Sequence, residues 1–122
     1  MRSAVHVRSS GSVKIISLDS ESVRARLAGT ARELRKRDNN VISVWLFGSL
    51  ARRDFLPGSD ADVLIVLKEC ALPFRDRIDR FMTTFSDIGI SVDVLPVTEF
   101  ELQDRADEPF WREVLAERER LA

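Results

Sequence analysis

Residues 47–67 read FGSLARRDFLPGSDADVLIVL, and the fold that we predict is built outward from this stretch. The run Val41–Phe47 is rich in β-branched and aromatic residues and meets Gly48, which is typical of a buried strand that enters a turn. Pro57-Gly58 marks a second turn, and Asp62–Leu67 beyond it is almost wholly apolar, so we expect another buried strand there. The segment between the two strands is too short for a full helix and predicts one or two helical turns and a loop.

Helical periodicity is found on both sides of these strands. Apolar residues predict a helix that begins near Ser20 and ends before Asp38, with a buried face made of Val23, Leu27, Ala31 and Leu34. Pro73 suits the first turn of a second helix, which Gly89 would end. The apolar face of that helix would consist of Phe74, Ile78, Phe81, Met82 and Phe85.

The C-terminal third of the chain adds a third strand, Ser91–Leu95, which we expect Pro96 to close. An amphipathic tail then predicts one or two closing helices, whose apolar residues are Phe100, Trp111, Val114, Leu115 and Leu121. This order of elements predicts an α/β (α+β) domain, in which helices cover a small mixed β-sheet. We expect residues 1–12 to form a flexible arm, the domain to occupy residues 13–122, and Val13–Ile16 to form a short edge strand.

Composition narrows the class of protein. The apolar share of 44% and the charged share of 32% indicate a globular chain, and no run approaches the ~20 apolar residues of a membrane span. The net charge of −1 gives no general attraction to nucleic acid or to anionic membranes. Cys70 is the only cysteine, which excludes an internal disulfide and a cysteine-built zinc site. The N-terminus lacks the apolar stretch of a secretory signal, so we expect a cytoplasmic protein.

Three aspartates interrupt the predicted strands. Asp60 and Asp62 are two positions apart, so their side chains share a face if the chain is extended there, and Asp93 lies within the next strand. Carboxylates gathered at one place repel each other, and a cation is the simplest compensation; oxygen ligands favour magnesium or manganese. The alternative is that these aspartates cap turns or pair with arginines.

Gly48-Ser49 follows the first predicted strand directly. A glycine allows close approach of a phosphate to the backbone, and the Ser49 hydroxyl and the amides of the turn can donate to phosphate oxygens. An isolated Gly-Ser pair is an ordinary turn in most proteins. Its position ahead of the aspartates favours a phosphate-binding role.

Together, FGSLARRDFLPGSDADVLIVL and the later SVDVLPV resemble the DNA polymerase β-like nucleotidyltransferase superfamily, and within it the small members called minimal nucleotidyltransferases. The resemblance implies that Gly48 and Ser49 hold a nucleoside triphosphate. It also implies that two magnesium ions, or manganese, are bound by Asp60, Asp62 and Asp93, all three of them catalytic. Many minimal nucleotidyltransferases are antitoxins that are paired with a helical HEPN-domain partner.

One position departs from the pattern of these relatives. They usually continue G-S-x-A-R-G, whereas Arg53 follows Arg52 here. If this position needs a positive φ, an arginine costs on the order of 1 kcal/mol. Arg52 and Arg53 are candidates for binding the nucleotide and neutralising pyrophosphate, with a solvated surface role as the alternative for each.

The resemblance implies transfer of a nucleoside monophosphate, AMP from ATP, to a hydroxyl group of a partner toxin protein. Two alternatives remain open, namely a non-catalytic binding module of the same fold and an aminoglycoside-type enzyme that modifies a small molecule. Basic residues of the first helix raise nucleic acid as an acceptor, although a solvated face is favoured: Arg24, Arg26, Arg32, Arg35, Lys36 and Arg37. The acceptor is expected on another chain, which is compatible with a homo- or hetero-oligomer.

Overall fold

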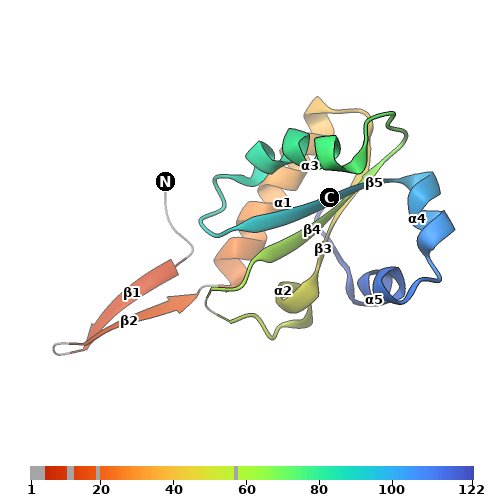
Figure 1. Ribbon diagram of the computed structural model, residues 1–122. Coiled ribbons are helices and arrows are strands. Elements are labelled where there is room, and N and C mark those ends of the chain that lie inside the picture. Colours follow the sequence, from red (N-terminus) through yellow and green to blue (C-terminus); the bar gives the residue numbers. More distant parts are fainter. Residues whose placement is uncertain (1–4, 11–12, 19, 57) are drawn as a thin grey trace.

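A computed structural model describes residues 5–10, 13–18, 20–56 and 58–122 of the chain. β1 (Val5–Ser10) and β2 (Val13–Leu18) pair in an antiparallel two-stranded sheet, which projects from the main body in Figure 1. The predicted edge strand lies within β2. The boundary drawn between residues 12 and 13 falls between these two paired strands, and residues 1–4 and 11–12 of the predicted arm lie outside the described residues. The flexibility of the arm stays a prediction.

The main sheet is small and mixed, as predicted, with the strand order β5-β4-β3-β6. β3 (Val41–Phe47) runs antiparallel to β4 (Ala61–Leu67) and to β6 (Glu119–Arg120), whereas β4 and β5 (Val92–Thr98) are parallel. The C-terminal end of β3 therefore lies beside the N-terminal ends of β4 and β5. This edge of the sheet brings the two predicted turn residues to the predicted carboxylates.

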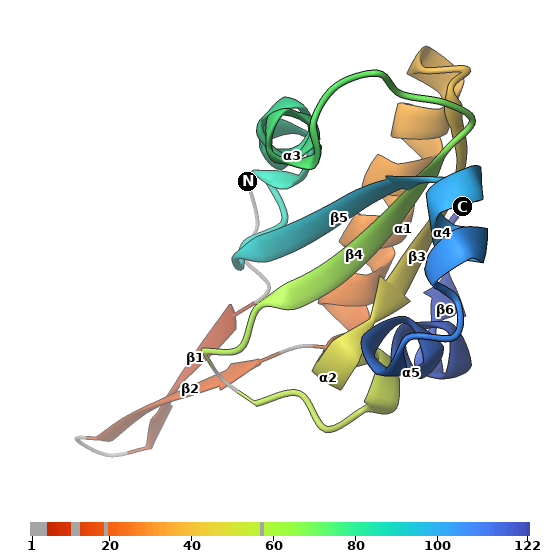
Figure 2. The same cartoon turned by 45° about the vertical axis from the view of Figure 1, so that its right-hand side comes forward.

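Helices cover both faces of this sheet, which Figures 1 and 2 show from two directions. They are α1 (Ser20–Arg37), α2 (Gly48–Arg52), α3 (Phe74–Met82) with the 3₁₀ turn η1 (Thr83–Phe85), α4 (Glu99–Arg105) and α5 (Pro109–Glu117). Among the described residues, none of these helices has the length and apolar character needed to cross a bilayer.

Alternating residues of β4 contribute to two separate apolar clusters. Val63, Ile65 and Leu67 pack with α1, α3 and η1, and Leu64 and Val66 pack with α5. Because both faces of β4 are covered, the strand is apolar almost throughout, as its sequence predicted. Asp62 has the same parity as Leu64, so it lies on the face that α5 covers.

Three elements differ from the prediction. β5 continues through Pro96 to Thr98. A proline is tolerated there because β5 is an edge strand and the Pro96 backbone faces away from β4. On that outer side, the Pro96 carbonyl accepts a hydrogen bond from Arg77. The second predicted helix ends at Met82 and tightens into η1, well before Gly89. β6 was not predicted, since two charged residues carry no strand pattern.

A buried arginine ties α3 to the far end of β5. The Arg77 side chain is 6% exposed and donates to both carboxylate oxygens of Glu101, at 2.6 and 3.1 Å. Glu101 also completes a capping box with Thr98 at the start of α4. The hydrogen bonds from Arg77 are the main cause that lowers the pKa of Glu101 to about 2. This network fixes the end of β5 that lies away from the aspartates.

Candidate active site

The two parallel strands place Asp62 and Asp93 side by side. In the pairing of β4 with β5, Asp62 is the direct partner of Asp93, and both strands begin at this edge. Asp60 stands two positions ahead of Asp62, close enough for its charge to raise the pKa of both Asp62 and Asp93. The structure thus brings together the three carboxylates that the sequence singled out.

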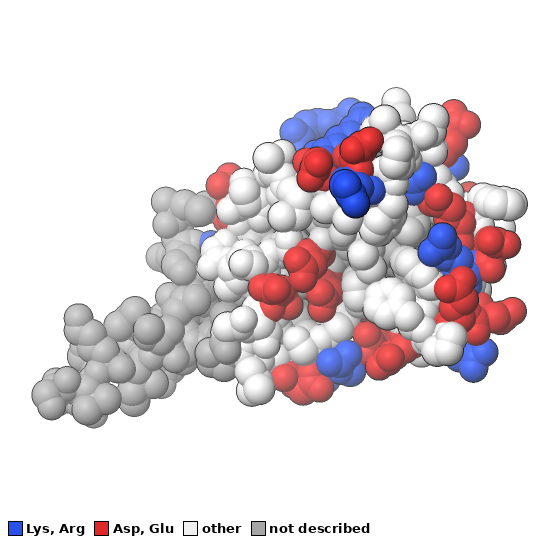
Figure 3. Space-filling model, in the orientation of Figure 1, with Lys and Arg blue, Asp and Glu red and all other residues white. Residues whose placement is uncertain are grey.

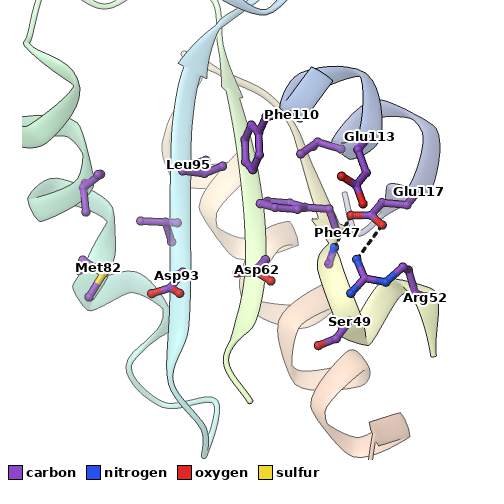
Figure 4. A pocket seen from close by; sticks show the side chains of 14 residues that line it. Phe47, Ser49, Arg52, Asp62, Met82, Asp93, Leu95, Phe110, Glu113 and Glu117 are labelled. Carbon is purple, nitrogen blue, oxygen red and sulfur yellow. Dashed lines mark hydrogen bonds and ion pairs between the residues drawn. The ribbon is translucent and has the colours of Figure 1, made fainter. Parts of the chain in front are cut away.

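A cleft of about 630 Å³ opens over these strands, as Figure 4 shows. Among the sequence-predicted residues, its lining includes Gly48, Ser49, Arg52, Asp62 and Asp93. Asp60 is not part of the lining and contributes through its proximity to Asp93. The structure therefore places the Gly48–Ser49 turn, predicted to bind phosphate, and two of the aspartates in the lining of a single cavity.

Electrostatics within the cleft oppose ionisation. Burial is the largest cause that raises the pKa of Asp62 to about 6, followed by the charges of Asp93 and Asp60, while Arg52 acts in the opposite direction. The pKa of Asp93 is also raised, first by burial and then by Asp60. Figure 3 shows acidic side chains gathered over β4 and β5 on this face. A cluster of acidic side chains with raised pKa values is the environment in which a bound cation is stabilised most strongly.

The donor set suits a divalent cation in its chemistry. Carboxylate oxygens are hard ligands that magnesium and manganese prefer, and the mutual repulsion of Asp60, Asp62 and Asp93 is relieved by positive charge. Their side chains are not already arranged as a cage, since no group of three His, Cys, Asp or Glu within the described part of the chain is set to hold an ion. Closing around a cation requires rotation of side chains, with the backbone positions already adjacent.

Gly48 makes a close approach that no other residue could make. Its φ is 76°, and a Cβ atom at this position would lie 2.2 Å from Oδ2 of Asp62. The sequence predicted a glycine that admits a phosphate to the backbone. The structure adds a second reason, since the glycine also admits the Asp62 carboxylate.

Arg53 adopts the left-handed conformation that the sequence analysis considered for this position, where the relatives usually have glycine. It caps the C-terminus of α2 with φ 67° and ψ 27°, the only non-glycine residue with positive φ among those described. Its side chain is exposed and pairs with Glu21 at 3.3 Å, outside the lining of the cleft. Arg52 points into the cleft and pairs with Glu117 at 2.9 Å and with Asp54 at 3.3 Å.

Four residues of α5 line this cleft, and the sequence analysis assigned none of them to the site: Phe110, Glu113, Val114 and Glu117. Phe110 is 53% exposed and packs edge-on against Phe47 and Trp111, so it forms an apolar wall. Glu113 and Glu117 add two carboxylates. Their spacing of four residues indicates one helix face, but only the tertiary structure reveals that this face meets the Gly48–Ser49 turn.

Comparison with known proteins agrees with this geometry. A sequence model of the family described as "Nucleotidyltransferase domain" matches residues 27–119, so the chain belongs to the nucleotidyltransferase domain family. The family match and the fold confirm the resemblance to minimal nucleotidyltransferases that the sequence indicated.

Two individual proteins illustrate the similarity. A bifunctional uridylyltransferase/uridylyl-removing enzyme from Pseudomonas putida is 38% identical over 73 residues, which cover 57% of this chain and 8% of that enzyme. The chain therefore corresponds to a small part of that relative. A crystal structure of a Sulfolobus solfataricus protein assigned as a nucleotidyltransferase superposes with a TM-score of 0.57, covering 83% of this chain and 84% of the other at 24% identity. At that identity the match shows the fold.

Gly48→Ala is predicted to destabilise the fold more than Gly58→Ala. Both glycines have positive φ, 76° and 87°, but a Cβ on Gly58 meets nothing within 4 Å. Gly58→Ala should therefore cost about 1 kcal/mol from the backbone alone, and Gly48→Ala a further ~1–3 kcal/mol from overpacking against Asp62. Urea unfolding of both variants measures the difference. Equal losses of stability would mean that Asp62 does not press against the turn.

Asp62→Asn is predicted to stabilise the metal-free protein above pH 6. The folded-state pKa of about 6 lies above the ordinary 3.8, so ionisation of Asp62 opposes folding as the pH rises through this range. The gain should be on the order of 1 kcal/mol near pH 7 and should vanish below pH 4. Urea unfolding in EDTA across this pH range provides the measurement, with the exposed Asp104→Asn on α4 as the control. A pH-independent difference would contradict the electrostatic assignment.

Proposed function

We propose that the protein is a magnesium-dependent nucleotidyltransferase that transfers AMP from ATP to a hydroxyl group of a partner protein. The observation that carries this proposal is the pairing of Asp62 with Asp93 across β4 and β5, in the same cleft as the Gly48–Ser49 turn. Membership of the nucleotidyltransferase domain family supports the reaction class. Asp60, Asp62 and Asp93 would hold two magnesium ions, or manganese in their place.

The residues of the cleft have separate roles in this proposal. Ser49 donates its hydroxyl to a phosphate oxygen, and Arg52 places positive charge beside the departing pyrophosphate. Asp93, which is exposed on the edge strand, aligns the acceptor hydroxyl or takes its proton. Metal ions held by Asp60, Asp62 and Asp93 would neutralise phosphate charge while the acceptor hydroxyl attacks the α-phosphate in line and pyrophosphate leaves.

The charge of the cleft favours metal-dependent binding. Four carboxylates line it against one arginine: Asp62, Asp93, Glu113 and Glu117, with Arg52. A triphosphate is itself strongly negative, so its entry is unfavourable unless cations accompany it. The curated relative is named for uridylyl transfer, which makes UTP the first alternative to ATP.

A partner protein, proposed here as a HEPN-domain toxin, is supported by the apolar surface around the cleft. Met82 and Phe110 line the cleft and are 45% and 53% exposed, and Phe74 lies in an adjoining pocket that shares Phe110. Nucleic acid is a weaker candidate, because Arg24 is buried against Glu119 and the Leu50 carbonyl and does not extend a basic surface along α1.

Nucleotide binding and transfer are predicted to separate in the aspartate variants. Asp60→Asn and Asp62→Asn should lose both, because these residues would bridge metal to phosphate, whereas Asp93→Asn should keep most affinity and lose transfer. Thermal shifts with ATP, UTP, CTP and GTP, with magnesium or with EDTA, report binding, and single-turnover assays report transfer. Equal shifts in EDTA would contradict the metal site. A parental rate in Asp93→Asn would make Asp93 a structural residue.

The acceptor is predicted to be a single protein. Incubation of the purified chain and its Asp93→Asn variant with α-phosphate-labelled ATP and a lysate of the native organism should label one discrete band with the parent only. Label confined to small molecules would favour the aminoglycoside-type reaction. Metal-dependent nucleotide binding without any labelled product would leave a binding module as the better description.

A further inference from the structure

We propose that Glu117 is a positioning residue of the nucleotide site, which fixes the Gly48 amide and the Arg52 side chain in the arrangement that receives a triphosphate. This inference rests on the proposed function. Glu117 is the last residue of α5, 69 positions along the chain from Gly48, and its side chain is only 14% exposed. No sequence pattern around the Gly48–Ser49 turn points to it.

One carboxylate bridges the backbone and the guanidinium. Oε1 of Glu117 accepts the Gly48 N–H at 3.0 Å, and Oε2 accepts a hydrogen bond from Arg52 at 2.9 Å, as the dashed lines in Figure 4 show. Both bonds have a charged acceptor, which strengthens them; the Glu117 side chain is largely shielded, whereas that of Arg52 is 43% exposed. The other partner of Arg52, Asp54, is 61% exposed and holds it at 3.3 Å. Glu117 is therefore the contact that determines where Arg52 lies.

Fixing the Gly48 peptide also fixes the distance between the turn and the metal-binding carboxylates. The backbone of Gly48 lies directly against Asp62, as the 2.2 Å approach of a hypothetical Cβ indicates. A small displacement of this peptide would move Ser49 relative to Asp62. Placement within about 0.5 Å is what a site that binds phosphate and metal together requires.

Glu117 is itself held in place through the strand that ends in the turn. Beyond α5, β6 pairs with β3, and Val44 exchanges backbone hydrogen bonds with Leu121 and Ala122. β3 continues into Phe47 and Gly48. Both ends of the contact between Glu117 and Gly48 are therefore anchored on the same strand, which makes the contact a rigid one.

Glu113 offers a matched control. It lies one turn earlier on α5, lines the same cleft and is exposed, and within the described residues its side chain makes no hydrogen bond or ion pair. Glu113→Gln thus removes the same charge from the same cleft without touching Gly48 or Arg52. Any effect of Glu117→Gln beyond that of Glu113→Gln reports the contacts and not the charge.

The contact can be tested without any assay of activity. Phe47-Gly48 is the only Phe-Gly step in the sequence, so ¹³C-carbonyl phenylalanine with ¹⁵N-glycine labelling isolates the Gly48 amide as one NMR signal. This signal should move in Glu117→Gln and Glu117→Ala and stay in place in Glu113→Gln. An unmoved signal in both Glu117 variants would overturn the contact.

The positioning role requires a second measurement, the KM for the nucleotide that the parent uses. Glu117→Ala should raise this KM about tenfold or more relative to Glu113→Gln, with a smaller fall in kcat, and Glu117→Gln should fall between them. Arg52→Gln combined with Glu117→Ala should add little to the KM of either single variant.

The outcomes separate this inference from the proposed function. If the parent binds no triphosphate with any metal, the proposed function fails and the positioning role fails with it. If the parent binds and transfers while Glu117→Ala and Glu113→Gln have the same KM, Glu117 only stabilises the fold and the inference alone is wrong. If Glu117→Ala binds the nucleotide more tightly, the carboxylate competes with phosphate, which also overturns the positioning role.

Discussion

The parallel pairing of β4 with β5 places Asp62 directly beside Asp93, and the site depends on this register. Two like charges on neighbouring strands repel by about 3–4 kcal/mol at an effective dielectric constant near 20. Val63 to Leu67, which follow Asp62, are at most 5% exposed, and each such burial stabilises the fold by roughly 1.5–3 kcal/mol. The apolar length of the strand therefore outweighs the repulsion at its start.

The helices pack on the apolar end of β4 and leave the charged end accessible, which turns this edge of the sheet into a cleft. On the face of α5, Trp111 and Val114 pack with Leu64 and Val66, at the apolar end of β4. The charged end of the strand, with Asp62 beside Asp93, lines the open cleft between α2, α3 and α5. The helices that complete the core thus also form the walls of the site.

The sequence predicted the parts of this arrangement that obey local periodicity. The apolar runs of β3 and β4 and the buried face of α1 all follow from spacing within a few residues. The parts that it missed depend on partners far along the chain. Arg77 is buried because Glu101 and three carbonyls meet it there, and Glu117 belongs to the site because β6 returns to β3. A charged residue at a helical position carries no signal of such a contact.

Arg53 illustrates how a local rule can be broken without loss of the site. Its left-handed backbone costs on the order of 1 kcal/mol, which a glycine would avoid. The Arg53 amide nevertheless bonds to the Leu50 carbonyl and the Asp54 amide to the Ser49 carbonyl, so α2 ends in the usual left-handed cap. Since the backbone after Ser49 keeps this closed form, the chain can return to Asp60 and enter β4 in register. The replacement of the relatives' glycine by Arg53 therefore affects the stability of the fold. The positions of the aspartates are determined by the pairing of the strands.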